Sequence, residues 1–129
     1  MNHLLEHCRP FIEAALRECS GTHSFDDVAE GIASGKMQLW PAEDACAVTE
    51  IAVYPQRTML NCFLAGGSME RLKDMAPAME AWAEAQGCDG TELTGRHGWA
   101  RALSGIGYKP AAVVMRKDFG NGRQADDEK

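Results

Sequence analysis

The stretch that decides the fold runs from Arg57 to Arg101 and reads RTMLNCFLAGGSMERLKDMAPAMEAWAEAQGCDGTELTGRHGWAR. Its apolar residues 58–64 are typical of a strand, and an amphipathic helix is expected from Met69 to about Gln86. Between them stands Ala65-Gly66-Gly67-Ser68. A strand that enters a helix through two glycines leaves free backbone N–H groups at the positive end of the helix, which suits a phosphate or a carboxylate.

The remainder of the C-terminal half continues the alternation of strand and helix. Gly87 ends the long helix, and a short strand is expected at residues 90–94, followed by a helix over residues 97–104. The apolar run Ala111–Arg116 predicts a final strand.

The N-terminal half predicts two helices and then two strands. Apolar side chains recur at helical spacing over residues 4–18, and Ser24 looks like the N-cap of a short helix that Gly35 ends. Strands are expected at 37–40 and 45–53, and the second forms a hairpin with residues 58–64.

This order predicts an α/β fold, with three antiparallel strands and then strands joined by crossover helices. We expect a single domain over residues 1–119 with a mixed, mostly antiparallel sheet of five or six strands flanked by helices. Residues 120–129 are glycine-rich and then polar and acidic, so we expect a disordered tail.

Composition and charge argue against several classes of function. The chain has 129 residues, is 45% hydrophobic and carries a formal net charge of −6, which argues against broad nucleic-acid or anionic-membrane binding. No segment approaches the length of a membrane span and no secretory signal is recognised, so we expect a cytoplasmic protein. The five cysteines show no metal-ligand spacing, and buried free thiols are expected rather than a metal site.

With this element order, the chain resembles the GNAT superfamily of N-acetyltransferases over roughly residues 4–119, and in particular small acetyltransferase-like proteins of bacteriophages and prophages. The matching segments are Leu64-Ala65-Gly66-Gly67, Glu80-Ala81-Trp82-Ala83, Gly87-Cys88, Gly95-Arg96-His97-Gly98-Trp99 and Gly107-Tyr108. The resemblance implies acetyl-CoA or another acyl-CoA as cofactor and an amine as acceptor.

The resemblance also implies a cofactor site. The family's turn Arg/Gln-x-x-Gly-x-Gly/Ala holds the pyrophosphate through backbone amides, so Gly66, Gly67 and Ser68 are the corresponding candidates, with Arg71 or Arg96 to neutralise the charge. The leading Arg or Gln of that turn is missing here. Leu103 stands where active members carry the tyrosine that protonates the leaving thiolate.

Two further candidates keep two interpretations each. Glu50 lies on a strand face, where the resemblance implies the general base; the alternative is a surface glutamate paired across the hairpin with Arg57 or Asn61. The basic residues Arg96, His97 and Arg101 form either a phosphate-binding cluster or local ion pairs.

The sequence therefore leaves two functions open. One is a coenzyme A-dependent N-acyltransferase. The other is a non-catalytic phage-encoded structural or interaction protein that keeps the fold, with a phage or virion protein as its partner.

Overall fold

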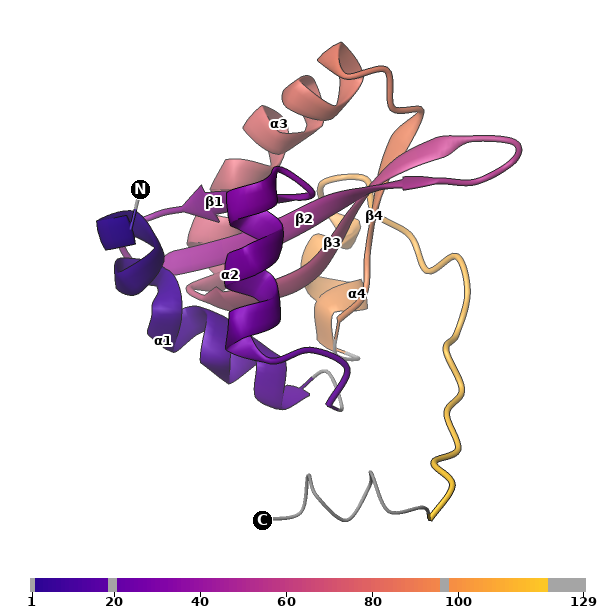
Figure 1. Cartoon of the computed structure of the whole chain (residues 1–129). Helices are drawn as coiled ribbons and strands as arrows, with labels where there is room; N and C mark the ends of the chain where they lie inside the picture. Colours follow the sequence, from indigo (N-terminus) through magenta and orange to yellow (C-terminus); the bar gives the residue numbers. More distant parts are fainter. Residues whose placement is uncertain (1, 19–20, 96–97, 121–129) are drawn as a thin grey trace.

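The computed structural model describes residues 2–18, 21–95 and 98–120, and Figure 1 shows the whole chain. In chain order the elements are α1 (Asn2–Glu18), α2 (Phe25–Ser34), β1 (Met37–Pro41), β2 (Ala45–Val53), β3 (Thr58–Gly67), α3 (Met69–Ala85), β4 (Gly90–Leu93) and α4 (Gly98–Ser104). No helix in these ranges is long and apolar enough to cross a membrane.

The four strands form one mixed sheet in the order β1-β2-β3-β4. β1 pairs antiparallel with β2, and β2 pairs antiparallel with β3. β3 and β4 are parallel, because α3 carries the chain back across the sheet between them. The α/β class and the mixed sheet are thus confirmed.

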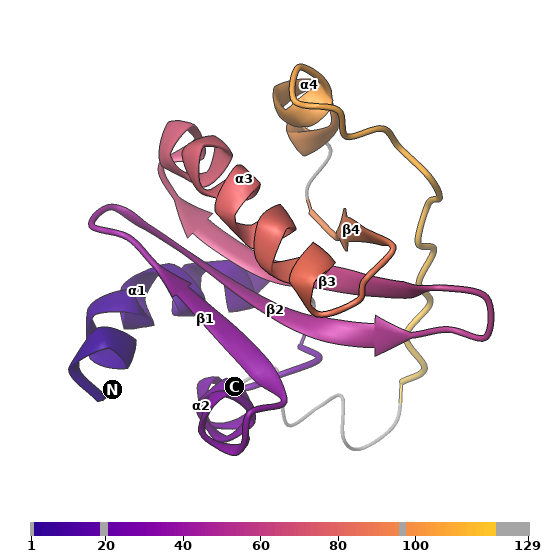
Figure 2. The same ribbon diagram turned by 90° about the horizontal axis from the view of Figure 1, so that it is seen from above.

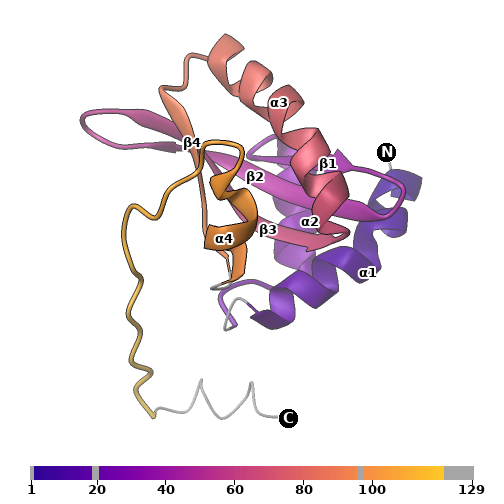
Figure 3. The same ribbon diagram turned by 180° about the vertical axis from the view of Figure 1, so that it is seen from behind.

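The helices cover the two faces of the sheet as pairs, α1 and α2 on one and α3 and α4 on the other (Figures 2 and 3). Strand alternation divides the side chains between these faces. Cys46 and Val48 of β2 join the core under α1 and α2, which also holds Cys8, Ile12, Val28, Ile32 and Leu64. Thr49 points to the α3 face, where its hydroxyl accepts from Trp40 Nε1 at 2.9 Å and donates to Gln38 Oε1 at 2.8 Å.

Local signals begin and end α2 where the sequence predicts. The Ser24 hydroxyl accepts from the N–H of Asp27, whose carboxylate accepts in return from the Ser24 N–H, which is a capping box. Gly35 follows α2 with φ of +85°, a conformation that glycine adopts without steric cost. Both ends of α2 are therefore confirmed.

The expected final strand at Ala111–Arg116 is wrong. Residues 109–120 form no regular element and are exposed, so the described sheet has four strands rather than five or six. The Tyr108 side chain is tied to Thr91, and Pro110, which has no N–H to donate, follows two residues later. An apolar run becomes a strand only where a neighbouring strand accepts its backbone groups, and no described strand pairs with this run.

Candidate functional site

The junction of β3 and α3 holds the candidates predicted for a pyrophosphate. β3 extends through Gly66 and Gly67, which lie opposite Cys46 and Ala45 of β2, so the glycines belong to the strand. Ser68 is the N-cap of α3. Its hydroxyl accepts from the N–H of Arg71 at 3.2 Å, and its own N–H donates to the carbonyl of Asp44 at 2.9 Å.

Close packing explains why both positions are glycine. A Cβ on Gly66 would lie 2.6 Å from the carbonyl oxygen of Phe11 in α1. Gly67 has φ of +100°, and a Cβ there would collide with the carbonyl oxygen of Asp44 and with Ala45. The two glycines are thus needed to bring β3 against α1 and against the β1–β2 turn, whatever they bind.

Carboxylates surround the start of α3. Arg71 Nε lies 2.9 Å from Asp44 Oδ1, and both side chains are largely exposed. The hydrogen bond between them lowers the pKa of Asp44 and raises that of Arg71. The negative charges of Asp74 and Glu43 raise the pKa of Arg71 further. Arg71 is therefore already neutralised by its neighbours, although it lies beside the predicted site.

The predicted basic cluster is only partly described. Arg96 and His97 lie outside the described residues, so their placement near the Gly66–Gly67 segment stays a prediction. Arg101 is exposed on α4. Leu103 lies on the same helix but is buried, 7% exposed, and lines a pocket between the helix and the sheet.

Glu50 lies in the middle of the sheet and is half-buried. Its Cα partners are Asn61 on β3 and Met37 on β1, so the cross-strand neighbour is Asn61 rather than Arg57. By strand alternation Glu50 is on the same face as Val48, the α1 and α2 face. Cys46, the β2 residue that pairs with Gly66, is four residues from Glu50 along the strand. This separation is roughly 13 Å at about 3.3 Å per residue.

A second carboxylate lies in the same row of the sheet as Glu50, two strands away. Glu92 on β4 is the partner of Asn61, and its Oε2 accepts a 2.6 Å hydrogen bond from the Tyr54 hydroxyl. That hydrogen bond raises the pKa of Tyr54, and the charge of Glu50 contributes as well. Glu50, Asn61 and Glu92 thus lie in one row across β2, β3 and β4, and Tyr54 from the end of the β2–β3 hairpin reaches Glu92.

Strands β3 and β4 separate beside α3. They pair from Met59↔Gly90 to Cys62↔Leu93, where β4 ends. β3 continues, with a register shift opposite Val48 and Thr49 that leaves Phe63 without a β2 partner. The last residues of β3 therefore have an open edge on the side where β4 turns into α4.

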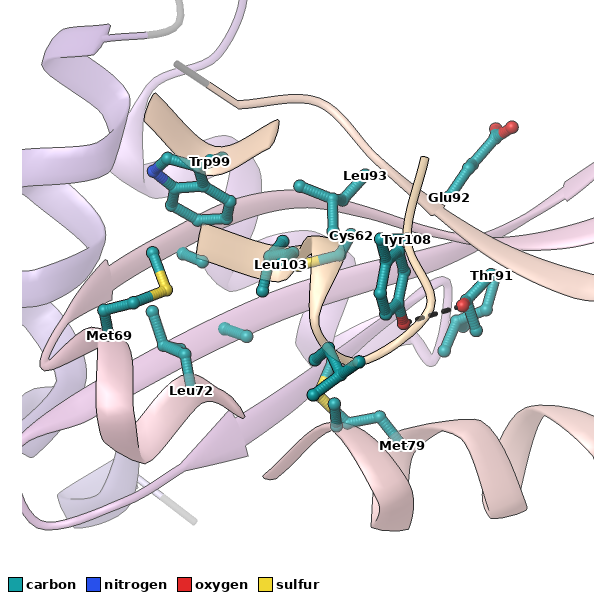
Figure 4. A pocket seen from close by; sticks show the side chains of 15 residues that line it. Cys62, Met69, Leu72, Met79, Thr91, Glu92, Leu93, Trp99, Leu103 and Tyr108 are labelled. Carbon is teal, nitrogen blue, oxygen red and sulfur yellow. Dashed lines mark hydrogen bonds between the residues drawn. The ribbon is translucent and has the colours of Figure 1, made fainter. Parts of the chain in front are cut away.

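An apolar pocket lies against this separation, between the sheet, α3 and α4 (Figure 4). Its cavity volume is about 50 Å³. The sheet contributes Ala47, Leu60, Cys62 and Ala65, α3 contributes Met69, Leu72, Ala76 and Met79, and α4 contributes Trp99 and Leu103. Figure 4 shows Met69, Leu72, Trp99 and Leu103 around one space, with Glu92 turned away from it.

The Cys62 thiol and the Tyr108 hydroxyl, which line the pocket, are held in their neutral forms. Burial raises the pKa of the Cys62 thiol to about 12, and its Sγ donates to the carbonyl of Leu64 at 3.6 Å. Burial likewise raises the pKa of Tyr108 to about 12, and its hydroxyl lies 2.9 Å from Glu80 Oε2 and 2.8 Å from Thr91 Oγ1. Neither side chain is a nucleophile at neutral pH.

Sequence reasoning missed this pocket, although the amphipathic helix expected from Met69 supplies one of its walls through Met69, Leu72, Ala76 and Met79. On the same helix, the Trp82 ring packs edge-on against that of Trp40, with ring centroids 5.8 Å apart. Tyr108 was recognised only as part of a Gly-Tyr pair. Its partners are 17 and 28 residues away, and no local pattern predicts such contacts.

The thiols and acidic side chains suggest no metal centre within the described ranges. Cys8, Cys46, Cys62 and Cys88 are free, and the first two are buried, as expected of core thiols, while Cys19 lies outside the described residues. No group of three His, Cys, Asp or Glu side chains gathers around a common point in the described part of the chain.

Comparison with solved structures identifies the architecture. A probable acetyltransferase superposes with a TM-score of 0.65 at 7% identity, over 95% of this chain and 94% of its own. This chain shares the fold of that probable acetyltransferase. A predicted acetyltransferase with acetyl-CoA from Clostridium acetobutylicum matches with a TM-score of 0.63 at 7% identity, over 88% of this chain and 91% of that one.

A third protein shares the same fold at higher identity. This protein, from Thermus thermophilus, matches with a TM-score of 0.65 at 17% identity, with 95% of each chain covered. Searches by sequence found no matching family model and no matching curated protein. At identities this low the similarity shows the fold alone, and the chemistry has to be argued from the residues.

Proposed function

We propose that this protein binds an acyl-coenzyme A beside the separated strands β3 and β4 and transfers the acyl group to an amine. The observation that carries this proposal is the apolar pocket that adjoins the open edge of β3, next to the start of α3. An apolar lining suits an acyl chain, and unpaired strand backbone offers hydrogen-bond groups to the amides of the coenzyme's arm. The acetyltransferase fold adds support, since one structure of this fold was solved with acetyl-CoA.

In this proposal the start of α3 holds the pyrophosphate. The N–H groups of Met69 and Glu70 have no acceptor within the helix, because they precede its first internal hydrogen bonds. Ser68 stands beside them as the N-cap. Arg71 would have to exchange Asp44 for the ligand, so we expect weak binding unless Arg96 also contributes.

Glu50 is the proposed base for the transfer, and because it lies on the α1 and α2 face of the sheet, the amine would have to reach the thioester from that face, where β3 and β4 separate. The amine nitrogen would give its proton to the Glu50 carboxylate and attack the thioester carbonyl carbon, and the carbon–sulfur bond would then break to release the coenzyme A thiolate. Leu103 cannot protonate that thiolate. The proton would come from water, so we expect transfer to be slow even when binding is tight.

Ligand-induced stabilisation tests the binding step. Acetyl-CoA at about 100 times its dissociation constant should stabilise the fold by roughly 2.7 kcal/mol, which is a rise of several degrees in melting temperature. Ala65→Leu, which fills the pocket, should abolish the rise, whereas Ala81→Leu on the exposed side of α3 should leave it unchanged. A rise that survives Ala65→Leu would place the ligand elsewhere.

Glu50→Gln tests the chemical step separately. Release of free coenzyme A thiol in the presence of amines should fall at least tenfold, while the melting shift with acetyl-CoA should remain. Glu84→Gln, an exposed change on α3, is the matched control. Equal rates in Glu50→Gln and in the unmodified protein would exclude Glu50 as the base.

A second candidate function is a non-catalytic interaction protein with the same fold. The close approach of Gly66 to Phe11 and of Gly67 to Asp44 accounts for both glycines without a ligand, and the Asp44–Arg71 pair accounts for the arginine. A phage origin and a virion partner remain predictions of this alternative. Absence of any melting shift with millimolar acetyl-CoA or coenzyme A would favour it.

A further inference from the structure

We propose that the acyl group which this protein takes from coenzyme A is an apolar chain of about four to six carbons rather than acetyl, and that Met79 limits its length. The inference rests on the proposed function, because it names the substrate class of the same pocket. Three observations carry it: the length of the pocket beyond the separation of β3 and β4, the volume left open in it, and the chemistry of its lining.

The pocket continues along α3 beyond the point where the thioester is expected. β3 and β4 separate after Cys62 and Leu93, which both line the pocket. Figure 4 shows Met69 and Trp99 near one end of the lining and Met79 near the other. With the pyrophosphate at the start of α3, the coenzyme's arm enters beside Met69. The acyl chain beyond the thioester therefore points toward Met79.

The length available to the chain follows from β4. Strand alternation points Thr91 and Leu93 to the pocket, and Figure 4 shows Glu92 turned away from it. Thr91 and Leu93 are about 7 Å apart along the strand, which is roughly the length of an extended chain of five carbons. Tyr108 closes the pocket at Thr91, because its hydroxyl lies 2.8 Å from Thr91 Oγ1 and 2.9 Å from Glu80 Oε2. The chain thus has a defined limit.

The open volume gives a similar size. A cavity holds roughly one water molecule for each 10–15 Å³, so the volume of about 50 Å³ corresponds to about three to five water molecules. A methylene group is close to a water molecule in size, so about three to five carbons fit beyond the carbonyl. This range corresponds to butanoyl through hexanoyl. An acetyl group would leave part of the space empty.

The lining suits a chain without charge. Ala47, Ala65 and Ala76 leave room on the sheet and on α3, and the flexible side chains of Met69 and Met79 adapt to what packs against them. No lysine or arginine is among the described residues that line the pocket. A chain that ends in a carboxylate would therefore bury an unpaired charge. We expect butanoyl to be preferred over succinyl, which has the same number of carbons.

Dissociation constants for a series of coenzyme A thioesters, measured by calorimetry on the full-length chain, test the inference. Each buried methylene contributes about 0.8 kcal/mol, which is about a fourfold gain in affinity. Affinity should therefore rise about fourfold per methylene from acetyl-CoA through butanoyl-CoA to hexanoyl-CoA, and octanoyl-CoA should gain nothing further. Succinyl-CoA should bind about tenfold more weakly than butanoyl-CoA, or weaker still.

Two substitutions on α3 move the length limit in opposite directions. Met79→Ala removes most of a side chain from the far end of the pocket, so octanoyl-CoA should become the tightest ligand. Met75→Ala is the same change on the same helix at a half-buried position outside the lining, and hexanoyl-CoA should remain the tightest. Ala76→Leu fills the middle of the pocket, so the advantage of hexanoyl-CoA over acetyl-CoA should disappear.

The outcomes separate this inference from the proposed function. Binding of coenzyme A and acetyl-CoA with no gain from longer chains would overturn the inference and leave the proposed function standing. A gain that continues beyond octanoyl-CoA in the unmodified protein would also overturn it, because such a chain would lie on an unbounded apolar surface. So would an unchanged length limit in Met79→Ala or, if that variant does not fold, an unchanged preference in Ala76→Leu. If neither coenzyme A nor any thioester binds, both proposals fail.

Discussion

Gly67→Ala should be the most destabilising alanine substitution among the exposed glycines. Gly67 has φ of +100°, which costs a residue with a side chain roughly 1–2 kcal/mol. Its Cβ would also collide with the Asp44 carbonyl and with Ala45, and overpacking of this kind costs about 1–3 kcal/mol. The expected loss in unfolding free energy is therefore about 2–5 kcal/mol.

Two matched substitutions separate these contributions. Gly87→Ala has a similar φ of +89° but open space around the new methyl group, so it should lose only the roughly 1–2 kcal/mol of backbone strain. Gly105→Ala has neither problem and should be neutral, or stabilising by up to about 1 kcal/mol.

Chemical denaturation of the three variants gives the unfolding free energies directly. In thermal melts each kcal/mol corresponds to about 3–5 °C for a chain of this size. If Gly67→Ala loses no more stability than Gly87→Ala, the close approach of β3 to the β1–β2 turn is wrong. The structural explanation of this glycine would then fail, and a ligand-binding role would regain weight.

Two further substitutions test single contacts. Tyr108→Phe removes the hydroxyl that donates to the Glu80 carboxylate and should cost about 1–2 kcal/mol in unfolding free energy. Tyr54→Phe at the exposed hairpin end should change the unfolding free energy little. Equal losses in the two variants would refute the special role of the pocket tyrosine. The Ser24 N–H donates to the Asp27 carboxylate and lowers its pKa. The stabilisation that this carboxylate gives to the fold is therefore complete above the ordinary carboxyl pKa, and it is lost as pH falls through the lowered pKa of the folded state. Asp27→Asn should therefore flatten the acid side of a stability–pH curve, and an unchanged curve would contradict this.

Most element boundaries were predictable because they depend on local chemistry. Ser24 and Gly35 bound α2 through a capping box and a left-handed residue, and both signals can be read from a few neighbouring residues. Strand β2 begins and ends at Ala45 and Val53, as the alternation indicates. Local signals therefore predicted the fold class well.

The errors come from contacts between distant segments. Segment 111–116 has the composition of a strand, but whether it becomes one depends on a partner edge that composition does not reveal. Arg71 is neutralised by Asp44, which is 27 residues away, and that ion pair changes its expected role in binding. The roles of Gly66, Gly67, Ser68 and Glu50 remain predictions for the same reason.

Methionine methyl groups provide the most direct test of acyl-coenzyme A binding. Met69 and Met79 line the pocket on α3, whereas Met37 packs against Gly31 on the opposite face of the sheet and is a control within the same molecule. In a ¹³C-methyl-methionine spectrum, titration with acetyl-CoA should shift the Met69 and Met79 signals and leave Met37 unchanged. Unchanged Met69 and Met79 signals at millimolar acetyl-CoA would contradict the proposed function.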